Sequence, residues 1–384
     1  MKIIFINQVT GPLLIDILNA YVKKDCEVTL YTGLITKTYA GLSDSVKVRK
    51  LCAYRRNNNF SRLLTWIIFF FQTIFLLIYD LKASTRIYFS SNPPFITFIS
   101  YLFKNKYDIH VYDVYPDALL ASPFITKNSL IFKLFSYLNK LVYAKAENIF
   151  TPSIGMKNML KEYVSESKIV VIPWWADTDY IKPINKDVNK FISKYNLNNK
   201  FIVMYSGNFG FTHNIEKILD TALFFKENTE IMFVIIGDGP KKLIVDNFML
   251  QNTLNNLLVL PFQDEKMLPY SLTASDISVV LDSFSYHDKD ISTASIPSKT
   301  YYLMSAGSVI LAVADKDSEL SRLINTYDIG ITDYNQDNHQ MIEFINYCFN
   351  NQEALLKYKK NSRKTSKLFT KKNADLIYQS MFKI

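Results

Sequence analysis

The stretch FIVMYSGNFGFTHNIEKIL (201–219) contains the three parts of a parallel β/α unit. Its first residues, FIVMYSG, have the apolar and β-branched character of a buried strand, and a turn with Gly207 and Gly210 follows. A helix is expected to begin near Asn214. Because such units assemble into doubly wound parallel sheets, the stretch predicts an α/β fold.

The same alternation of short apolar runs and helix-length segments continues along the chain. In the first half, strands are expected at 2–7, 27–32, 86–91, 108–114, 148–153 and 168–173. In the second half, they are expected at 201–207, 231–239, 256–262, 277–282 and 308–314. The polar segment 174–191, which contains Pro183, joins the two series and is typical of a linker. With 384 residues, we expect two doubly wound, Rossmann-like domains.

The N-terminus and the cysteines indicate the compartment. The run MKIIFINQV is too short for the apolar core of a signal peptide and is better explained as a first strand. Cys26, Cys52 and Cys348 are far apart and fit no metal-binding spacing, so we interpret them as thiols in a reducing environment. We therefore expect a cytoplasmic protein.

Positive charge is concentrated in the first half of the chain. The net charge is +9, of which residues 1–180 carry +8 and the remainder +1. This asymmetry suggests an anionic partner on one face, either a membrane surface or a nucleic acid.

Residues 63–79, LLTWIIFFFQTIFLLIY, form an apolar helix of roughly 25 Å at about 1.5 Å per residue. Three interpretations compete: a helix buried on the first sheet, a helix at the membrane interface and a transmembrane span. No acidic residue occurs between Asp44 and Asp80. We expect the helix at about 60–80 both to pack inward and to contact anionic lipid. The residues expected at the membrane are Arg55, Arg56, Arg62, Trp66, Phe69 and Phe70.

Two further segments carry features of an anion site. IIGDGPKKL (235–243) follows a strand and places Asp238 between two glycines. It repeats the glycine turn GNFG (207–210), which follows the preceding strand. In SIPSKTYYLMSAGSVILAVA (295–314), Ser298 and Lys299 lie where a loop becomes a helix. A lysine is unfavourable at that end of a helix dipole, and a bound diphosphate would compensate for it.

The motifs YSGNFG (205–210), IGDGP (236–240) and PSK…MSAG (297–307), with SSNPP (90–94) and YDVYPDAL (112–119), resemble glycosyltransferase family 4. The similarity extends over the whole chain and is strongest to the branch of bacterial surface-polysaccharide assembly. It implies a retaining enzyme of GT-B architecture, with two Rossmann-like domains facing across a cleft. We expect an N-terminal acceptor domain at 1–180, a C-terminal donor domain at 181–365, and a final helix at 366–384 that returns to the first domain.

The resemblance also implies the roles of individual residues. Lys299 would stabilise the leaving diphosphate, and Asp113 would lie near the acceptor hydroxyl. The residues implied in binding a nucleotide-sugar donor are Gly11, Gly207, Asn208, Gly210, His213, Gly237, Asp238, Ser298 and Lys299. No cofactor is implied.

The sequence departs from the family pattern at three places. Ala294 and Tyr302 occupy the positions of a glutamate pair that many members carry. Thr212, His213 and Asn214 stand where other members have an arginine and a lysine, and Tyr112 replaces an arginine before Asp113. The pairs Asp288/Asp290 and Asp315/Asp317 spell DxD, which binds manganese in another glycosyltransferase fold, but we expect no metal here.

We therefore expect a glycosyltransferase of hexosyl or N-acetylhexosaminyl type, located peripherally on the inner face of the plasma membrane. It would transfer sugar from a nucleotide-sugar, such as a UDP-sugar, to a polyprenyl-diphosphate-linked saccharide in capsule or O-antigen synthesis. The main alternative is a non-catalytic relative that binds glycans or scaffolds an assembly. A nicotinamide-dependent oxidoreductase would need GxGxxG, which is absent. The basic residues adjoin an apolar helix, which favours lipid over nucleic acid.

Overall fold

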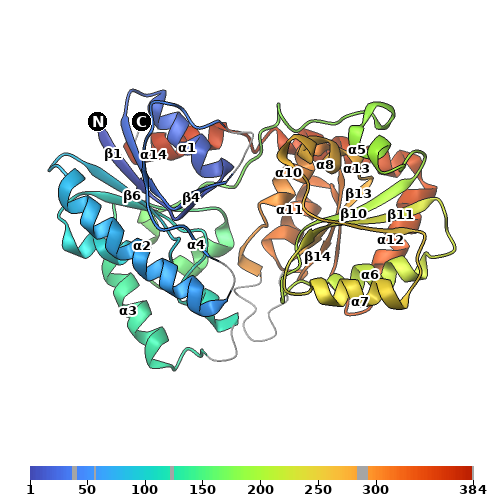
Figure 1. The fold of residues 1–384 in the computed structure, drawn as a ribbon, viewed down its shortest axis with the longest axis horizontal. Coiled ribbons are helices and arrows are strands. Elements are labelled where there is room, and N and C mark those ends of the chain that lie inside the picture. Colours follow the sequence, from blue (N-terminus) through green and yellow to red (C-terminus); the bar gives the residue numbers. More distant parts are fainter. Residues whose placement is uncertain (37–40, 56–57, 122–124, 283–292, 383–384) are drawn as a thin grey trace. The chain divides into compact units, whose positions relative to one another are not determined.

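The computed structural model describes residues 1–36, 41–55, 58–121, 125–282 and 293–382 (Figure 1). The chain divides into two compact units. Unit 1 comprises Met1–Trp174 together with Lys371–Ile384, and unit 2 comprises Trp175–Thr370. The boundaries expected from the sequence were residues 180 and 365.

Unit 1 contains a parallel sheet of seven strands in the order β5-β3-β1-β6-β7-β8-β9. Its strands are β1 (Lys2–Ile6), β3 (Glu27–Thr32), β5 (Lys47–Lys50), β6 (Arg86–Ser90), β7 (Tyr107–His110), β8 (Ile149–Thr151) and β9 (Ile169–Val171). The short strands β2 (Val9–Thr10) and β4 (Leu34–Ile35) pair separately. The apolar residues of β1 are fully buried because an inner strand of a parallel sheet is covered on both faces.

Helices and 3₁₀ turns connect the strands of unit 1. The α-helices are α1 (Pro12–Val22), α2 (Asn59–Asp80), α3 (Leu130–Lys145), α4 (Ile154–Leu160) and α14 (Lys372–Phe382). The 3₁₀ helices are η1 (Ile96–Leu102), η2 (Asp117–Ala121) and η3 (Glu166–Lys168). The C-terminal α14 packs on α1, where the rings of Tyr21 and Tyr378 lie 5.0 Å apart. The last helix of the chain is therefore part of unit 1 (Figure 1).

One face of α2 is anchored to the rest of unit 1. Asn58 caps the helix by accepting a hydrogen bond from the Ser61 amide at 2.7 Å. Four side chains at i+4 spacing are buried: Thr65, Phe69, Thr73 and Leu77. At the end of the helix, Asp80 pairs with Arg49 of β5 at 3.2 Å.

The burial of Phe69 corrects one sequence-based prediction. Phe69 was expected at the membrane, but its side chain has no exposed surface because it lies in the i+4 stripe facing the sheet. Trp66 and Phe70 are half-buried, and both of their rings contact the ring of Phe95. Arg55 and Arg62 are exposed, whereas Arg56 lies outside the described residues.

Unit 2 contains a six-stranded parallel sheet in the order β12-β11-β10-β13-β14-β15. Its strands are β10 (Phe201–Asn208), β11 (Ile231–Asp238), β12 (Leu257–Leu260), β13 (Ile277–Leu281), β14 (Val309–Val313) and β15 (Gly330–Asp333). Strands β11 and β12 lie on one side of β10, and β13, β14 and β15 lie on the other. Strands β10 and β13 therefore flank a topological switch point, where α/β proteins bind ligands at the carboxyl ends of the strands.

Helices cover both faces of this sheet (Figure 1). They are α5 (Lys190–Lys194), α6 (Ile215–Phe224), α7 (Lys242–Gln251), α8 (Leu268–Ala274), α10 (Lys299–Ala306), α11 (Glu319–Tyr327), α12 (His339–Asn350) and α13 (Gln352–Ser366), with 3₁₀ turns η4 (Lys186–Val188) and η5 (Glu265–Met267). Along β10, Val203 and Tyr205 face the core shared with α6, α7 and α12. Ile202 and Met204 face the core shared with α5 and α8. The alternation follows from the two-residue period of a strand, and the predicted fold of two Rossmann-like parallel sheets is confirmed.

Candidate functional site

The glycine turns of unit 2 lie side by side at the carboxyl edge of the sheet. Strands β10 and β11 pair in parallel register, which places Gly207 beside Gly237 and Asn208 beside Asp238. The two motifs, 30 positions apart in sequence, therefore form one continuous edge next to the switch point.

Close backbone packing requires glycine at Gly237. Its φ of +156° is a conformation that L side chains rarely adopt, and an added Cβ would lie 1.9 Å from the Gly207 carbonyl oxygen. The same Cβ would lie 2.8 Å from Cε1 of the buried Phe209 ring. At Gly207 the nearest neighbours of a Cβ are side-chain atoms, Lys299 Nζ at 3.2 Å and the Tyr205 hydroxyl at 3.3 Å. Gly207 thus leaves space that the lysine ammonium approaches.

Lys299 begins α10 and reaches across to the end of β10. Its Nζ lies 4.3 Å from the centroid of the Tyr205 ring, a cation–π distance. Ser298 occupies the N-cap position of α10, but its side chain makes no capping hydrogen bond. The amino end of α10 and the ammonium group thus both present positive charge next to Gly207.

Burial makes the Lys299 ammonium unusual. It lowers the pKa of Lys299 to about 8, and the carboxylate of Asp282, at the end of β13, only partly opposes this effect. An ammonium with a lowered pKa has lost part of its hydration, so an anion placed beside it would be attracted more strongly than by a solvated lysine.

A small hydrogen-bond network holds the turn after β10. The Asn208 carbonyl oxygen accepts from the Tyr205 hydroxyl at 2.7 Å and from His213 Nδ1 at 2.9 Å. Because a carbonyl oxygen can only accept, Nδ1 carries the proton. Lys241 Nζ in turn donates to the His213 carbonyl oxygen at 2.8 Å and pairs with Glu216 at 2.9 Å. The turn is therefore tied to both following helices, α6 and α7.

The surroundings of His213 set its charge and the position of its proton. Burial, together with Lys299 and Lys241, lowers the pKa of His213, so the ring is neutral at neutral pH. Its one proton is on Nδ1 and is donated to Asn208. In this arrangement His213 holds the turn through Nδ1, and its contact with a phosphate stays a prediction.

Most of the predicted donor residues of unit 2 lie together. Gly207, Asn208, Gly237 and Asp238 share the sheet edge, and Lys299 contacts it. A Cβ on Gly210 would lie 3.2 Å from Nδ2 of the Asn208 side chain. Tyr205, which was not predicted from the sequence, lies under the ammonium. Its position two residues before Gly207, on the same face of the strand, could have indicated that it lies at the site.

The two predicted residues of unit 1 follow strands of its own sheet. Gly11 is the N-cap of α1, after β1, and Asp113 is an exposed residue after β7. Both therefore lie beyond the carboxyl ends of parallel strands, which are the usual ligand edge.

The described residues contain no group of three or more His, Cys, Asp or Glu side chains that could hold a metal ion. Asp315 and Asp317 form a local turn, in which the Asp315 carboxylate accepts from the Asp317 amide at 2.9 Å. Asp288 and Asp290 lie outside the described residues.

Known proteins resemble this chain in sequence and in structure. Residues 187–365 match the family model described as glycosyl transferases group 1. The probable glycosyltransferase WbjE of Pseudomonas aeruginosa is 28% identical over 229 residues, which cover 59% of this chain and 55% of that protein. The putative colanic acid biosynthesis glycosyl transferase WcaI of Escherichia coli K12 is 24% identical over 224 residues, covering 57% and 54%. The chain thus matches about half the length of these curated relatives.

Solved structures match over the full length. A crystal structure of Anabaena Alr3699/HepE in complex with UDP and glucose has a TM-score of 0.73 at 16% identity and covers all of both chains. Sucrose-phosphate synthase of Thermosynechococcus elongatus has a TM-score of 0.76 at 13% identity, covering 100% of this chain and 98% of that one. The chain has the GT-B fold, and its residues 187–365 match the family model of the glycosyl transferases group 1.

Gly237→Ala should destabilise the protein by about 2 kcal/mol or more, because the new Cβ meets backbone and the positive φ is strained. Gly41→Ala is the matched control, since a Cβ there has no atom within 4 Å. Urea denaturation gives the free energy of unfolding of each variant. Equal stabilities of the two variants would contradict the close packing of the glycine turns.

Proposed function

We propose that the chain is a retaining glycosyltransferase of family 4 that takes a sugar from a nucleotide-sugar, such as a UDP-sugar. The acceptor is a polyprenyl-diphosphate-linked saccharide, in the synthesis of a surface polysaccharide such as capsule or O-antigen. The observation that carries the proposal is the Lys299 ammonium, held over Tyr205 and against Gly207 at the switch point of unit 2. The family match over 187–365 and the similarity to a putative colanic acid biosynthesis glycosyl transferase support it.

The chemistry of transfer needs charge stabilisation on the donor side. As the bond from the sugar to the diphosphate breaks, negative charge grows on the departing oxygens. Lys299 and the amino end of α10 are preorganised positive groups that would stabilise this charge without a metal. In unit 1, Asp113 is the proposed group near the acceptor hydroxyl, which attacks on the face that the diphosphate leaves.

Lys299→Ala should reduce turnover by about a hundredfold or more, on the scale of losing one preorganised electrostatic contact. Release of UDP or another nucleoside diphosphate from a panel of nucleotide-sugars, with a lipid-linked saccharide present, measures turnover. Lys266→Ala, an exposed lysine of unit 2, is the control. Unchanged turnover in Lys299→Ala would remove the proposed role. No release with any donor would favour the alternative, a non-catalytic binding or scaffold protein.

The lowered pKa of Lys299 predicts a pH dependence of UDP binding. Above about pH 8 the free ammonium loses its proton, whereas a bound diphosphate favours the charged form. UDP affinity should therefore fall as pH rises through about 8, approaching tenfold per pH unit. The terminal phosphate, with a pKa of about 6, is already ionised there. Calorimetry across this range should show the fall in the parent chain and a flat profile in Lys299→Met; identical profiles would contradict the assignment.

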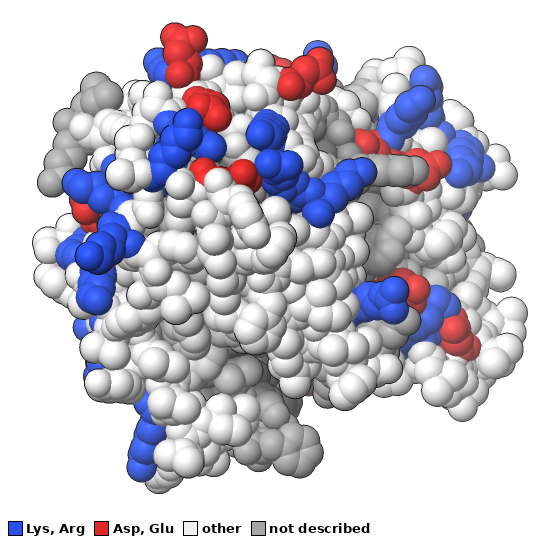
Figure 2. All heavy atoms as spheres, turned by 60° about the vertical axis from the view of Figure 1, so that its left-hand side comes forward, with Lys and Arg blue, Asp and Glu red and all other residues white. Residues whose placement is uncertain are grey.

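We further propose that unit 1 binds the membrane peripherally, on the cytoplasmic face. The exposed side of α2 carries large apolar residues, among them Phe71 and Phe75. Helix α3 adds Leu130, Ile131 and Leu134, all exposed, and η1 contacts both helices. Figure 2 shows a broad face with few charged side chains, around which Lys and Arg lie with some Asp and Glu among them. An exposed apolar surface with lysines and arginines near it is a composition that anionic bilayers bind.

The packing of α2 favours this peripheral arrangement over a transmembrane span. By length and composition, Phe60–Asp80 could cross a membrane. However, α2 connects β5 and β6, which belong to the same sheet, and a span would place them on opposite sides of the bilayer. The Gln8 side chain also donates to the Thr65 carbonyl oxygen at 3.0 Å, which ties the helix to unit 1.

Phe71→Ser/Phe75→Ser should weaken binding to phosphatidylglycerol-containing vesicles by roughly tenfold or more, because each buried aromatic side chain contributes about 1.5–3 kcal/mol. Phe224→Ser/Phe262→Ser removes two exposed phenylalanines of unit 2 and is the control. Vesicle co-sedimentation measures the binding. Equal binding by the two variants would mean that α2 does not contact lipid.

A further inference from the structure

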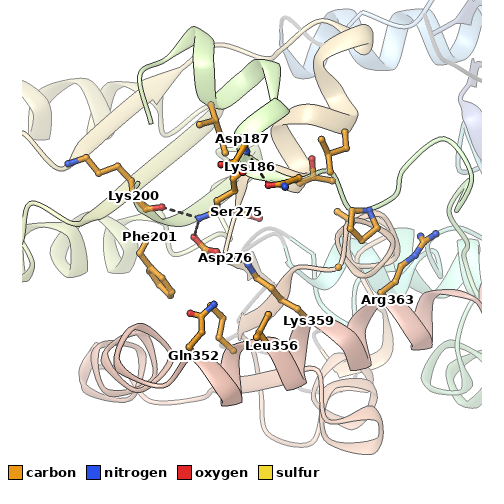
Figure 3. Close-up of a pocket in the computed structure, with 18 of the residues that line it drawn as sticks. Lys186, Asp187, Lys200, Phe201, Ser275, Asp276, Gln352, Leu356, Lys359 and Arg363 are labelled. Carbon is orange, nitrogen blue, oxygen red and sulfur yellow. Dashed lines mark hydrogen bonds and ion pairs between the residues drawn. The ribbon is translucent and has the colours of Figure 1, made fainter. Parts of the chain in front are cut away.

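A second basic region lies at the opposite end of the unit 2 sheet from the glycine turns. A hollow of about 1060 Å³ opens at the amino ends of β10 and β13, between them and α13 (Figure 3). In Figure 3, Lys200 and Asp276 lie on one side, and Leu356 and Lys359 of α13 lie on the other. Since β10 rises about 3.3 Å per residue, Phe201 at this end lies roughly 23 Å from Asn208 at the donor edge.

The hollow carries an excess of positive charge. Its lining contains seven lysines and arginines but only three acidic residues. The cations are Lys186, Lys200, Lys359, Lys360, Arg363, Lys364 and Lys367, and the acids are Asp187, Glu230 and Asp276. Converging cations repel one another unless an anion lies between them.

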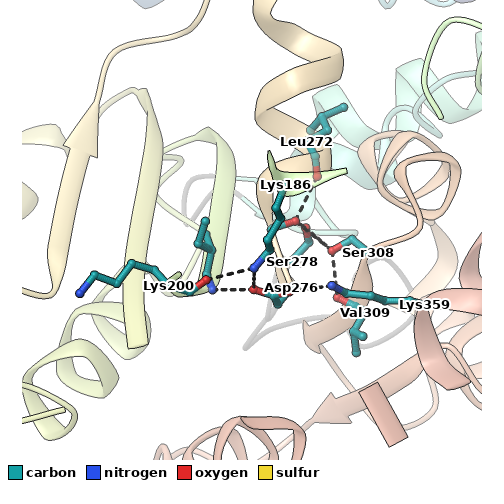
Figure 4. A network of polar contacts seen from close by, with 10 residues as sticks. Lys186, Lys200, Leu272, Asp276, Ser278, Ser308, Val309 and Lys359 are labelled. Carbon is teal, nitrogen blue, oxygen red and sulfur yellow. Dashed lines mark hydrogen bonds and ion pairs between the residues drawn. The ribbon is translucent and has the colours of Figure 1, made fainter. Parts of the chain in front are cut away.

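Asp276 is already committed to two of these cations. Its carboxylate accepts from Lys359 Nζ at 2.6 Å, from the Ile202 amide at 2.9 Å and from Lys186 (Figure 4). Burial alone would raise the pKa of Asp276, but Lys359 and Lys186 hold the pKa below its usual range. This cluster joins the starts of β10 and β13 to α13 and is structural. One carboxylate also leaves two ammonium groups incompletely neutralised.

The remaining cations of the hollow are not paired with acids in the described part of the chain. Arg363 donates to neutral oxygens, including the Ser305 carbonyl at 2.9 Å and the Thr178 carbonyl at 3.0 Å. Lys360 and Lys364 are exposed, and no described carboxylate lies within ion-pair distance of them. They are spaced i, i+4 on α13, where like charges destabilise a helix by about 0.2–0.5 kcal/mol.

The other lining residues define what kind of anion fits. Leu197, Phe201 and Leu356 give the hollow apolar walls beside the ammonium groups. Phosphate oxygens are the acceptors that clustered lysines and arginines bind most strongly, and apolar walls favour an organic group attached to the phosphate.

We propose that this hollow is a second anion site, separate from the donor site, that binds a phosphate-bearing ligand through Lys360, Lys364 and Lys367. The ligand is either a free phosphate compound or the headgroup of an anionic lipid. The site is independent of the glycosyl-transfer proposal, since it shares no residue with the glycine turns or Lys299.

The test uses Lys360→Gln/Lys364→Gln in a Lys299→Ala background, so that pyrophosphate reports on the hollow alone. The control is Lys226→Gln/Lys266→Gln in the same background, which removes the same charge from exposed positions outside the hollow. Calorimetry measures pyrophosphate binding at low salt, and co-sedimentation measures binding to phosphatidylcholine vesicles with and without phosphatidylglycerol. Thermal melting checks that all variants are folded.

We expect the hollow variant to bind pyrophosphate about thirtyfold more weakly than the control variant, because two lysines at about 1 kcal/mol each contribute about 2 kcal/mol. If vesicle binding is unchanged, the ligand is a free phosphate compound. If phosphatidylglycerol-dependent vesicle binding also falls, the ligand is a lipid headgroup. Equal affinities of the hollow and control variants for both probes would overturn the proposal. UDP binding by the hollow variant with Lys299 intact tests the donor site separately.

Discussion

The Lys299 ammonium, held over the Tyr205 ring and against Gly207, is the contact on which the account of the site depends. Desolvation of this group lowers its pKa to about 8. The carboxylate of Asp282 compensates for only part of the lost hydration. The free energy of burying the cation is therefore recovered best when an anion binds. A Cβ at Gly207 would lie 3.2 Å from Lys299 Nζ, so a larger residue there would crowd the space beside the ammonium.

The parallel sheet of unit 2 brings this contact together from distant parts of the chain. Strands β10 and β13 are neighbours although their sequences are more than 60 positions apart, and α10 follows β13. Lys299 is thereby delivered to the end of β10, while Gly237 arrives from β11 in register. The Asn208 carbonyl, which accepts from both Tyr205 and His213, keeps the turn in the conformation that leaves Gly207 open. The proposed donor chemistry follows from this topology.

Much of this arrangement could be predicted from sequence, because periodicity and glycine placement are local signals. The strand–turn–helix pattern of 201–219 predicted β10 and the start of α6 at Asn214. The inward side of α2 was not predicted correctly at Phe69, since an all-apolar helix does not show which face meets the sheet. The role of Tyr205 and the neutral state of His213 depend on contacts between side chains and backbone. The cations of the basic hollow come from positions between 186 and 367. No short motif could predict that they would lie together.

The most direct test is a crystal structure of the protein with UDP bound. The account predicts a diphosphate oxygen within about 3 Å of Lys299 Nζ, with the diphosphate lying over Gly207 at the carboxyl ends of β10 and β13. A diphosphate bound elsewhere in unit 2, with the ammonium still on the Tyr205 ring and no phosphate beside it, would contradict the account.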